Sequence, residues 1–215
     1  RLYLVGGLTS PIMTKIFYQR IARALEENKI TNFVVTFIEG SKDLGTRGLR
    51  HLCDNGEFLL FDFGQTNIKI GHYLKEDNNV VLDSILPSVK SDFLFYKYKD
   101  ESELKQTALL LHEYIISVIE DTCLLTDFKG SKIKLSIANY VYNGRIYSHR
   151  GGYGKLAYLS DNYQEYLSKD LTKRLDRNID VQLFHDTSSM ALNFEETNNT
   201  AVISLGTAFG VAFVE

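Results

Sequence analysis

The sequence predicts an α/β fold, built around a lobe of three consecutive strands followed by alternating helices and strands. Three observations support this prediction. From Phe58 to Glu195 the spacing of apolar residues gives the order βββαβαβα. A glycine- and threonine-containing turn lies near each end of this region, between two strands. A strand–helix–strand–helix unit, residues 1–52, precedes it.

The opening unit begins with a short apolar strand over residues 2–5 that ends in Gly6-Gly7. Thr9 or Ser10 can cap the helix that follows, and Pro11 suits its first turn. Apolar residues then recur at near-helical spacing to about residue 28. A strand over 32–38 and a short helix near 45–52 complete the unit.

The remaining elements follow from periodicity and turn residues. We expect strands over 58–62, 66–75, 79–87, 132–142, 181–186, 200–205 and 210–214, and helices over 101–122, 163–175 and 188–195. Three strands in a meander followed by αβαβα is the order of the ribonuclease-H-like fold, the building block of the actin-type ATPases. The glycine-rich loop over 151–154 is expected to be flexible or to cover a substrate, away from both of the glycine- and threonine-containing turns.

Composition narrows the class of protein. The chain has 215 residues, 44% hydrophobic and 24% charged, with a net charge of −3 and no basic block, so nucleic acid and membrane are not expected partners. No apolar run approaches the roughly 20 residues that cross a bilayer. Two cysteines are too few for a disulfide framework and favour a reducing, cytoplasmic compartment. Because Arg1 leads at once into a strand, we expect the chain to be a fragment.

The segment FDFGQTNIK contains the first candidate site. Gly64 lets the backbone approach a phosphate, while Gln65, Thr66 and Lys69 can contact it. The carboxylate of Asp62 can hold Mg²⁺, directly or through water. The alternative is a hairpin whose aspartate and glycine serve turn geometry alone.

A second turn of the same kind occurs in SLGTAFG. Gly206, Thr207 and Gly210 are its candidate phosphate contacts, about 140 residues after the first turn. Taken singly, this turn has the same hairpin explanation. Together, the two turns are what a two-lobed phosphate clamp requires.

Between the turns, Asp186 ends an apolar strand and directly precedes a helix. A carboxylate there can accept the proton of a hydroxyl that attacks the γ-phosphate. Alternatively, Asp186 or Thr187 caps the helix. In combination with the two turns, the role of catalytic base is favoured.

These segments together resemble the ROK family of sugar kinases and regulators. FDFGQTNIK resembles its first phosphate motif, D-x-G-x-T, and SLGTAFGVAF its second, G-T-G-x-G-x-G. LFHDTSSMAL resembles the segment N-D-A-N-A-A-A-L, whose aspartate is the catalytic base. YLVGGLTS resembles the adenosine-side glycine motif, and GTRGLRHL the closing G-A-A helix.

The resemblance implies ATP and Mg²⁺ as cofactors and a hexose or sugar derivative as substrate. Gly6 and Gly7 would approach the adenosine, and His185 and Asn139 would contact the sugar. His185 stands where the family has asparagine, and Ala208 and Val211 replace phosphate-motif glycines. The family's E-H-x-G segment and cysteine-rich loop are missing from the sequence. A non-catalytic module that senses a sugar or nucleotide is therefore the alternative.

The order of the motifs differs from that of the family. Residues 1–55 and 198–215 are expected to form the second, adenosine-side lobe, and residues 56–197 the first. A circular permutation, a tandem junction or a partial chain would each explain this order. The second lobe would be incomplete and expose a sheet edge, so we expect a partner chain or further residues to cover it. A homo-oligomer is left open, and a DNA-binding repressor is disfavoured because no helix-turn-helix precedes the first phosphate motif.

Overall fold

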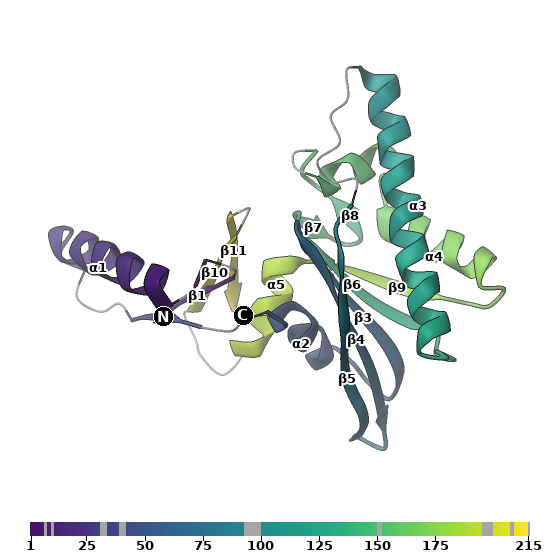
Figure 1. The fold of residues 1–215 in the computed structure, drawn as a ribbon, viewed down its shortest axis with the longest axis horizontal. Coiled ribbons are helices and arrows are strands. Elements are labelled where there is room, and N and C mark those ends of the chain that lie inside the picture. Colours follow the sequence, from purple (N-terminus) through teal and green to yellow (C-terminus); the bar gives the residue numbers. More distant parts are fainter. Residues whose placement is uncertain are drawn as a thin grey trace.

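The computed structural model describes residues 1–6, 8–9, 11–30, 34–38, 42–92, 100–149, 152–194, 200–206 and 209–214. Two β-sheets lie on either side of a pair of short helices, α2 and α5 (Figure 1). The larger sheet carries the long helices α3 and α4, and the smaller sheet lies next to α1 (Figure 1).

The larger sheet has five strands in the order β5-β4-β3-β6-β9. These are β3 (Gly56–Phe63), β4 (Asn67–Glu76), β5 (Asn79–Lys90), β6 (Lys132–Ile137) and β9 (Asp180–His185). Strands β3, β4 and β5 are antiparallel neighbours, whereas β6 and β9 run parallel to β3. This topology, with helices following β5, β6 and β9, is the ribonuclease-H-like fold of the actin-type ATPases, and it confirms the fold class predicted from the sequence.

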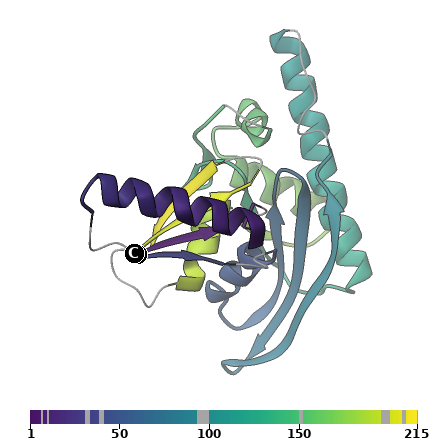
Figure 2. The ribbon, with the colours of Figure 1, turned by 60° about the vertical axis from the view of Figure 1, so that its left-hand side comes forward.

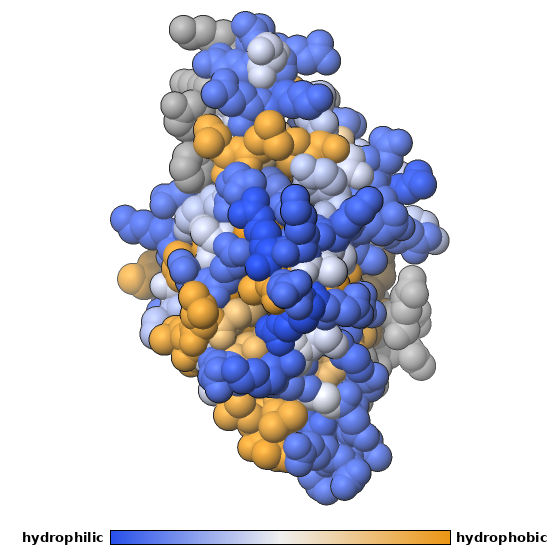
Figure 3. All heavy atoms as spheres, turned by 90° about the vertical axis from the view of Figure 1, so that its right-hand side faces the viewer, coloured by the Kyte–Doolittle hydropathy of each residue, from blue (hydrophilic) through white to orange (hydrophobic). Residues whose placement is uncertain are grey.

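One face of this sheet packs against α3 (Glu101–Leu125) and α4 (Tyr163–Arg174). Because side chains alternate along a strand, Leu59, Phe61 and Phe63 of β3 all enter this core. Figure 3 shows the side of the molecule on which α3 and α4 lie. Its surface is largely hydrophilic with separate apolar patches, as expected for a face in contact with water.

The opposite face packs against α2 (Leu44–His51). Phe58 and Leu60 of β3 form a small core there with Leu49 of the helix. The same alternation brings the polar side chains of Asp62 and Ser136 to this face, near the carboxyl ends of β3 and β6.

The smaller sheet has the order β11-β10-β1-β2. Its strands are β1 (Leu2–Val5), β2 (Val35–Phe37), β10 (Thr200–Leu205) and β11 (Phe209–Val214). Strand β1 is parallel to both β10 and β2, and β10 and β11 are antiparallel. Among the described strands, this is the order of the larger sheet without its outermost antiparallel strand.

The flanks of the smaller sheet are lightly covered. Helix α1 (Pro11–Glu27) lies across it in Figure 2, with Tyr18 near Phe37 of β2. At the other end, β11 is the edge strand of the described sheet, and Phe209 and Phe213 are 66% and 75% exposed. Within the described ranges, no helix is both long and apolar enough to cross a bilayer.

Helix α5 (Asp186–Ala191) connects the two sheets, because it continues directly from β9 and packs on the smaller sheet. Met190 and Ala191 share a small core with Val202 of β10. Next to it, α2 approaches so closely that a Cβ on Gly48 would overlap the carbonyl oxygen of Ser189. Glycine is therefore required where the two helices meet.

The structure differs from the sequence-based elements around residues 138–146. Strand β6 ends at Ile137, and the chain then forms the hairpin β7 (Val141–Tyr142) and β8 (Arg145–Ile146). Asn143 and Gly144 form its turn with φ of 50° and 74°, the backbone that an Asn-Gly pair favours. The predicted single strand over 132–142 is therefore wrong beyond residue 137.

Two 3-10 segments occur among the described residues, η1 (Tyr153–Tyr158) and η2 (Leu192–Phe194). The helix expected over 188–195 begins two residues earlier, at Asp186, and continues into η2. Of the strand expected over 32–38, residues 35–37 form β2, and residues 32–33 lie outside the described part of the chain.

Candidate active site

Polar side chains from β3, β4 and β6 meet where β3 and β6 end. The Asp62 side chain is 1% exposed, and one of its oxygens, Oδ1, accepts a hydrogen bond of 3.0 Å from Ser136 Oγ. Its Oδ2 accepts from Lys69 Nζ, also at 3.0 Å. In register, Asp62 lies opposite Ser136 on one side and Lys69 on the other, so sheet pairing alone brings the three together.

Helix α2 closes over the Asp62 carboxylate. A Cβ on Gly45, in the first turn of α2, would lie 2.5 Å from Asp62 Cγ. Only glycine permits this approach, which explains why the glycine-rich GTRGLRHL segment lies beside the first phosphate motif.

The turn after β3 is held by two hydroxyl groups. The carbonyl oxygen of Gly64 accepts from Ser91 Oγ at 2.6 Å and from the Tyr153 hydroxyl at 3.0 Å, while its N–H donates to the Asp62 carbonyl. Gln65 and Thr66 lie at the tip, half-buried and exposed respectively. Tyr153 also corrects an expectation: the described part of the 151–154 loop contacts the first hairpin instead of lying away from it.

The second hairpin approaches from the smaller sheet. A Cβ on Gly210 of β11 would overlap Thr187 Oγ1, the residue directly after Asp186. Gly206 is exposed at the bend after β10, and Thr207 lies outside the described residues. Asp186 therefore lies where the carboxyl end of the larger sheet meets the hairpin of the smaller one.

Gly6, from the candidate adenosine-side motif, follows β1 and lies next to the end of β10. Gly6 has φ of 106°, and a Cβ there would lie 2.5 Å from the carbonyl oxygen of Leu205, the last residue of β10. The N–H of Leu8 donates to that carbonyl at 3.0 Å. Gly7 lies outside the described residues. The placement of Gly6 beside the second phosphate turn requires glycine for both its backbone angle and its closeness.

Asp186 does not cap its helix. The N-cap position belongs to His185, whose side chain makes no capping bond, so the capping explanation is wrong. Asp186 Oδ1 instead accepts from the Thr187 N–H at 2.7 Å and from Thr187 Oγ1 at 3.2 Å. Burial, together with the charge of Asp62, raises the pKa of Asp186 to about 7, against weaker lowering by Thr187 and Lys69.

The raised pKa of Asp186 predicts a pH-dependent stability. The group has a pKa of 3.8 in the absence of these interactions and about 7 in the folded chain, so folding disfavours its ionised form. This cost is absent below the unfolded value, grows as pH rises, and is complete above about pH 7, where it reaches up to about 4 kcal/mol. Asp186→Asn removes it, so the variant should gain more stability over wild type at about pH 8 than at about pH 5 in urea unfolding. An equal difference at both pH values would contradict the burial of this carboxylate.

His185 contributes a neutral ring beside Asp186. Burial lowers its pKa to about 4, so at pH 7 its Nε2, 3.2 Å from Asp186 Oδ1, forms no ion pair. Nδ1 lies 3.1 Å from Ser188 Oγ, and the ring stacks on Tyr140 with centroids 4.8 Å apart. Asn139 is buried with its Nδ2 donating to the Ser148 carbonyl at 3.0 Å. Sugar contact by His185 and Asn139 remains a prediction.

Several residues at this site were not identified from the sequence. Ser136 had a detectable signal, because it is a polar residue in an otherwise apolar strand end, and it lies opposite Asp62 on the neighbouring strand. Gly45, Thr187 and Tyr153 lie in segments that the sequence singled out for other reasons. Their contacts at this site had no signal, since each joins segments far apart in the chain.

The donor set fits a magnesium ion bound together with a nucleotide. Among the described residues, no cluster of three or more metal-ligating side chains occurs. Asp62 is the carboxylate that could hold the ion, and its negative charge raises the pKa of the nearby Asp186. A cation beside Asp62 would reduce this repulsion. Magnesium is commonly held by one or two carboxylates, with waters and substrate phosphates supplying the remaining oxygens.

No family model matches the chain, and no curated protein matches its sequence. Solved structures similar to it include a putative N-acetylmannosamine kinase from Listeria monocytogenes, at 20% identity and a TM-score of 0.44 over 74% of this chain and 47% of that one. A hexokinase from Schistosoma mansoni complexed with glucose has 18% identity and a TM-score of 0.48 over 74% and 36%.

A ROK family transcriptional regulator, described as a homologue of the E. coli MLC protein, has 13% identity and a TM-score of 0.43 over 74% and 36%. The chain thus spans less than half the length of each of these proteins. At these identities and TM-scores the comparisons carry no argument about activity, which has to come from the side chains of the site itself.

Proposed function

We propose that the chain belongs to an ATP-dependent kinase of ROK type that phosphorylates a hexose or a sugar derivative. The observation that carries the proposal is the position of Asp186. Its carboxylate is largely buried, with 18% of the side chain exposed, and has a pKa near 7. The charge of Asp62, beside the first phosphate turn, contributes to raising that pKa, and the residue after Asp186 contacts the second hairpin.

In this proposal, Gly64–Thr66 and Gly206–Thr207 hold the ATP phosphates, and Gly6-Gly7 approaches the adenosine. Bound Mg²⁺ would neutralise charge on the phosphate oxygens, with Asp62 as the residue that holds it, directly or through water. The Lys69 ammonium group donates to Asp62 in the present structure. With ATP bound, it would instead donate to a phosphate oxygen.

Asp186 takes the proton of the sugar hydroxyl as its oxygen attacks the γ-phosphorus. The bond from that phosphorus to the bridging oxygen breaks, and ADP leaves. A carboxylate with a pKa near 7 is a stronger base than an ordinary one and is still substantially ionised at neutral pH. His185 and Asn139 would orient the sugar, and approach of the two sheets would exclude water as a competing acceptor.

The direct test is sugar-dependent ADP release. We expect one sugar in a panel of hexoses, amino sugars and N-acetyl sugars to stimulate ADP release above the rate with ATP alone, and only when magnesium is present. Absence of stimulation by every sugar would contradict the kinase proposal.

One observation favours the second candidate, a non-catalytic sugar- or nucleotide-sensing module. Both oxygens of Asp62 already accept hydrogen bonds from within the chain, from Ser136 and Lys69. Val211 also stands where the family's second motif has glycine. Binding of MgATP or of a sugar without turnover would support this module.

A further inference from the structure

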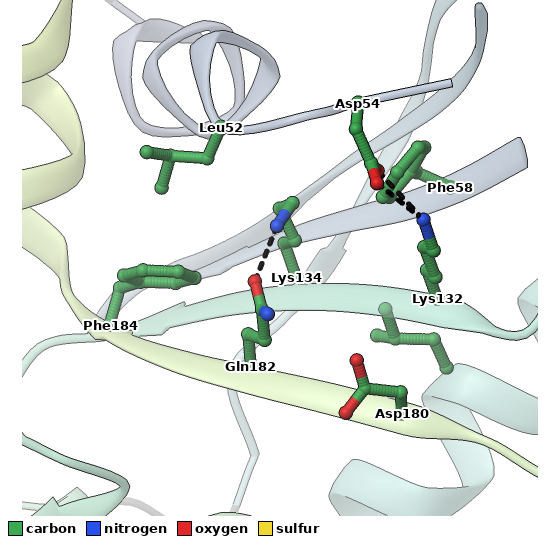
Figure 4. Close-up of a pocket in the computed structure, with 9 residues that line it drawn as sticks. Leu52, Asp54, Phe58, Lys132, Lys134, Asp180, Gln182 and Phe184 are labelled. Atoms are coloured by element: carbon green, nitrogen blue, oxygen red, sulfur yellow. Dashed lines mark hydrogen bonds and ion pairs between the residues drawn. The ribbon is translucent and has the colours of Figure 1, made fainter. Parts of the chain in front are cut away.

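A groove of about 510 Å³ lies on the α2 face of the larger sheet, between the end of α2 and strands β6 and β9 (Figure 4). Its walls include Leu52, Phe58, Lys134, Gln182 and Phe184. None of the residues proposed for phosphoryl transfer lines it. Its volume lies in the range of about 300–1,000 Å³ typical of small-molecule sites.

The centre of the groove is a buried cation that forms no direct ion pair with any described residue. Lys134 is 6% exposed, and its ammonium group donates to Oε1 of Gln182. Across the described ranges, no carboxylate forms an ion pair with Lys134, because Asp54 instead pairs with Lys132 through both oxygens at 2.8 Å. An ammonium group taken out of water without a direct ion pair is costly, and burial lowers the pKa of Lys134. The charges of Asp54 and Asp180 raise that pKa more weakly and compensate the burial only in part.

The neighbouring thiol does not supply the missing charge. Cys53 lies near Lys134, but burial raises the pKa of its thiol to about 12, so the thiol is neutral at pH 7. The nearby aromatic rings offer only partial compensation, with the Lys134 ammonium 5.5 Å from the Phe58 centroid and 5.9 Å from that of Phe184.

The polar atoms define which anion fits. Since Oε1 of Gln182 accepts from Lys134, the other end of that amide, Nε2, is a donor adjacent to the ammonium. Figure 4 shows Lys134 and Gln182 facing each other between Phe58 and Phe184. Two neighbouring N–H donors match the two oxygens of a carboxylate, and the flanking rings match an apolar body.

We propose that this groove binds a small carboxylic acid with a flat apolar body. The carboxylate lies on Lys134 and Gln182, and the body lies against Phe184 and Leu52. Asp180, at the start of β9, also lines the groove and disfavours ligands with more than one negative charge, such as phosphate monoesters. The proposal does not depend on the kinase activity, because the two sites share no residue.

The test uses matched pairs of acids and amides on the 215-residue chain. Phenylacetate, benzoate, indole-3-acetate and hexanoate are each compared with the corresponding neutral amide by calorimetry and by NMR shifts of Phe58 and Phe184. At least one acid should bind about tenfold or more tightly than its amide, because only the acid gains the charge-assisted bond to Lys134. If no acid binds more tightly than its amide, the proposal is wrong.

Two variants assign the effect to Lys134. Lys134→Met keeps the length of the side chain and removes the charge, so it should weaken binding of the best acid about tenfold or more without affecting the amide. Lys132→Met makes the same change at the rim, on the same strand, and should weaken binding no more than about threefold. Circular dichroism checks that both variants fold, and in wild type the Lys134 Cε shift should titrate at higher pH with the acid bound. Equal losses in the two variants, or an unchanged Lys134 titration, would overturn the proposal.

Discussion

Asp186→Asn is expected to abolish sugar-dependent ADP release while leaving MgATP binding within about threefold of wild type. Asparagine is nearly isosteric but cannot accept the proton of the attacking hydroxyl, and loss of general-base catalysis costs about 10²–10⁴-fold in rate. ATP affinity should change little, because Asp186 acts on the sugar and not on the phosphates. The measurements are a coupled ADP-release assay and calorimetry with MgATP.

The matched control is Asp121→Asn, which removes an exposed carboxylate from α3, far along the chain from the site. Its turnover should equal that of wild type. In wild type, kcat/KM should rise with pH and level off above about 7, following ionisation of Asp186. Turnover retained by Asp186→Asn would sink the assignment of the base.

Gly48→Ala is expected to give the largest loss of stability of the Gly→Ala changes at the described glycines, because its Cβ would meet a backbone atom at the closest approach. The new Cβ would overlap the carbonyl oxygen of Ser189, which belongs to the backbone of α5 and cannot rotate away as a side chain would. The two helices would have to separate, at a cost of about 1–3 kcal/mol or more. Urea unfolding of the variant and of wild type measures this difference.

The control for this effect is Gly71→Ala, in the middle of β4. A Cβ at Gly71 meets its nearest atom, Leu60 Cβ, at 3.5 Å, which is ordinary contact. This variant should unfold within about 0.5 kcal/mol of wild type. Equal losses for the two variants would show that the contact between α2 and α5 is not tight.

The fold could be predicted because its elements carry local signals. The apolar alternation of β3, β6 and β9 and the helical spacing of α3 gave the correct order, although not the pairing of β1 with β10. The hairpin at β7 and β8 was missed, even though the Asn143-Gly144 pair is a recognised turn signal. The strand predicted over 132–142 was extended past the end of β6 at Ile137 and into this hairpin.

For the candidate site, the sequence could predict only the residues proposed for catalysis and phosphate binding, and not the residues that position them. Asp62, Lys69 and Asp186 could be named as candidates because each lies at or near the end of a strand in a recognisable motif. Ser136, Gly45 and Tyr153 were not, because their contacts join segments separated by many residues, and a single sequence contains no record of such pairs. The placement of Asp186 as the first residue of α5, and not as its cap, required the backbone conformation.

Calorimetric titration of MgATP into wild type and Asp62→Asn tests the central claim, that this end of the larger sheet forms a nucleotide-phosphate site. Wild type should bind MgATP with a dissociation constant in the micromolar to millimolar range, more weakly when EDTA removes magnesium. Asp62→Asn should bind ATP with no such dependence on magnesium, because the residue that holds the ion has lost its charge. No binding of MgATP by the folded wild-type chain would contradict the phosphate clamp, and with it both proposed nucleotide functions.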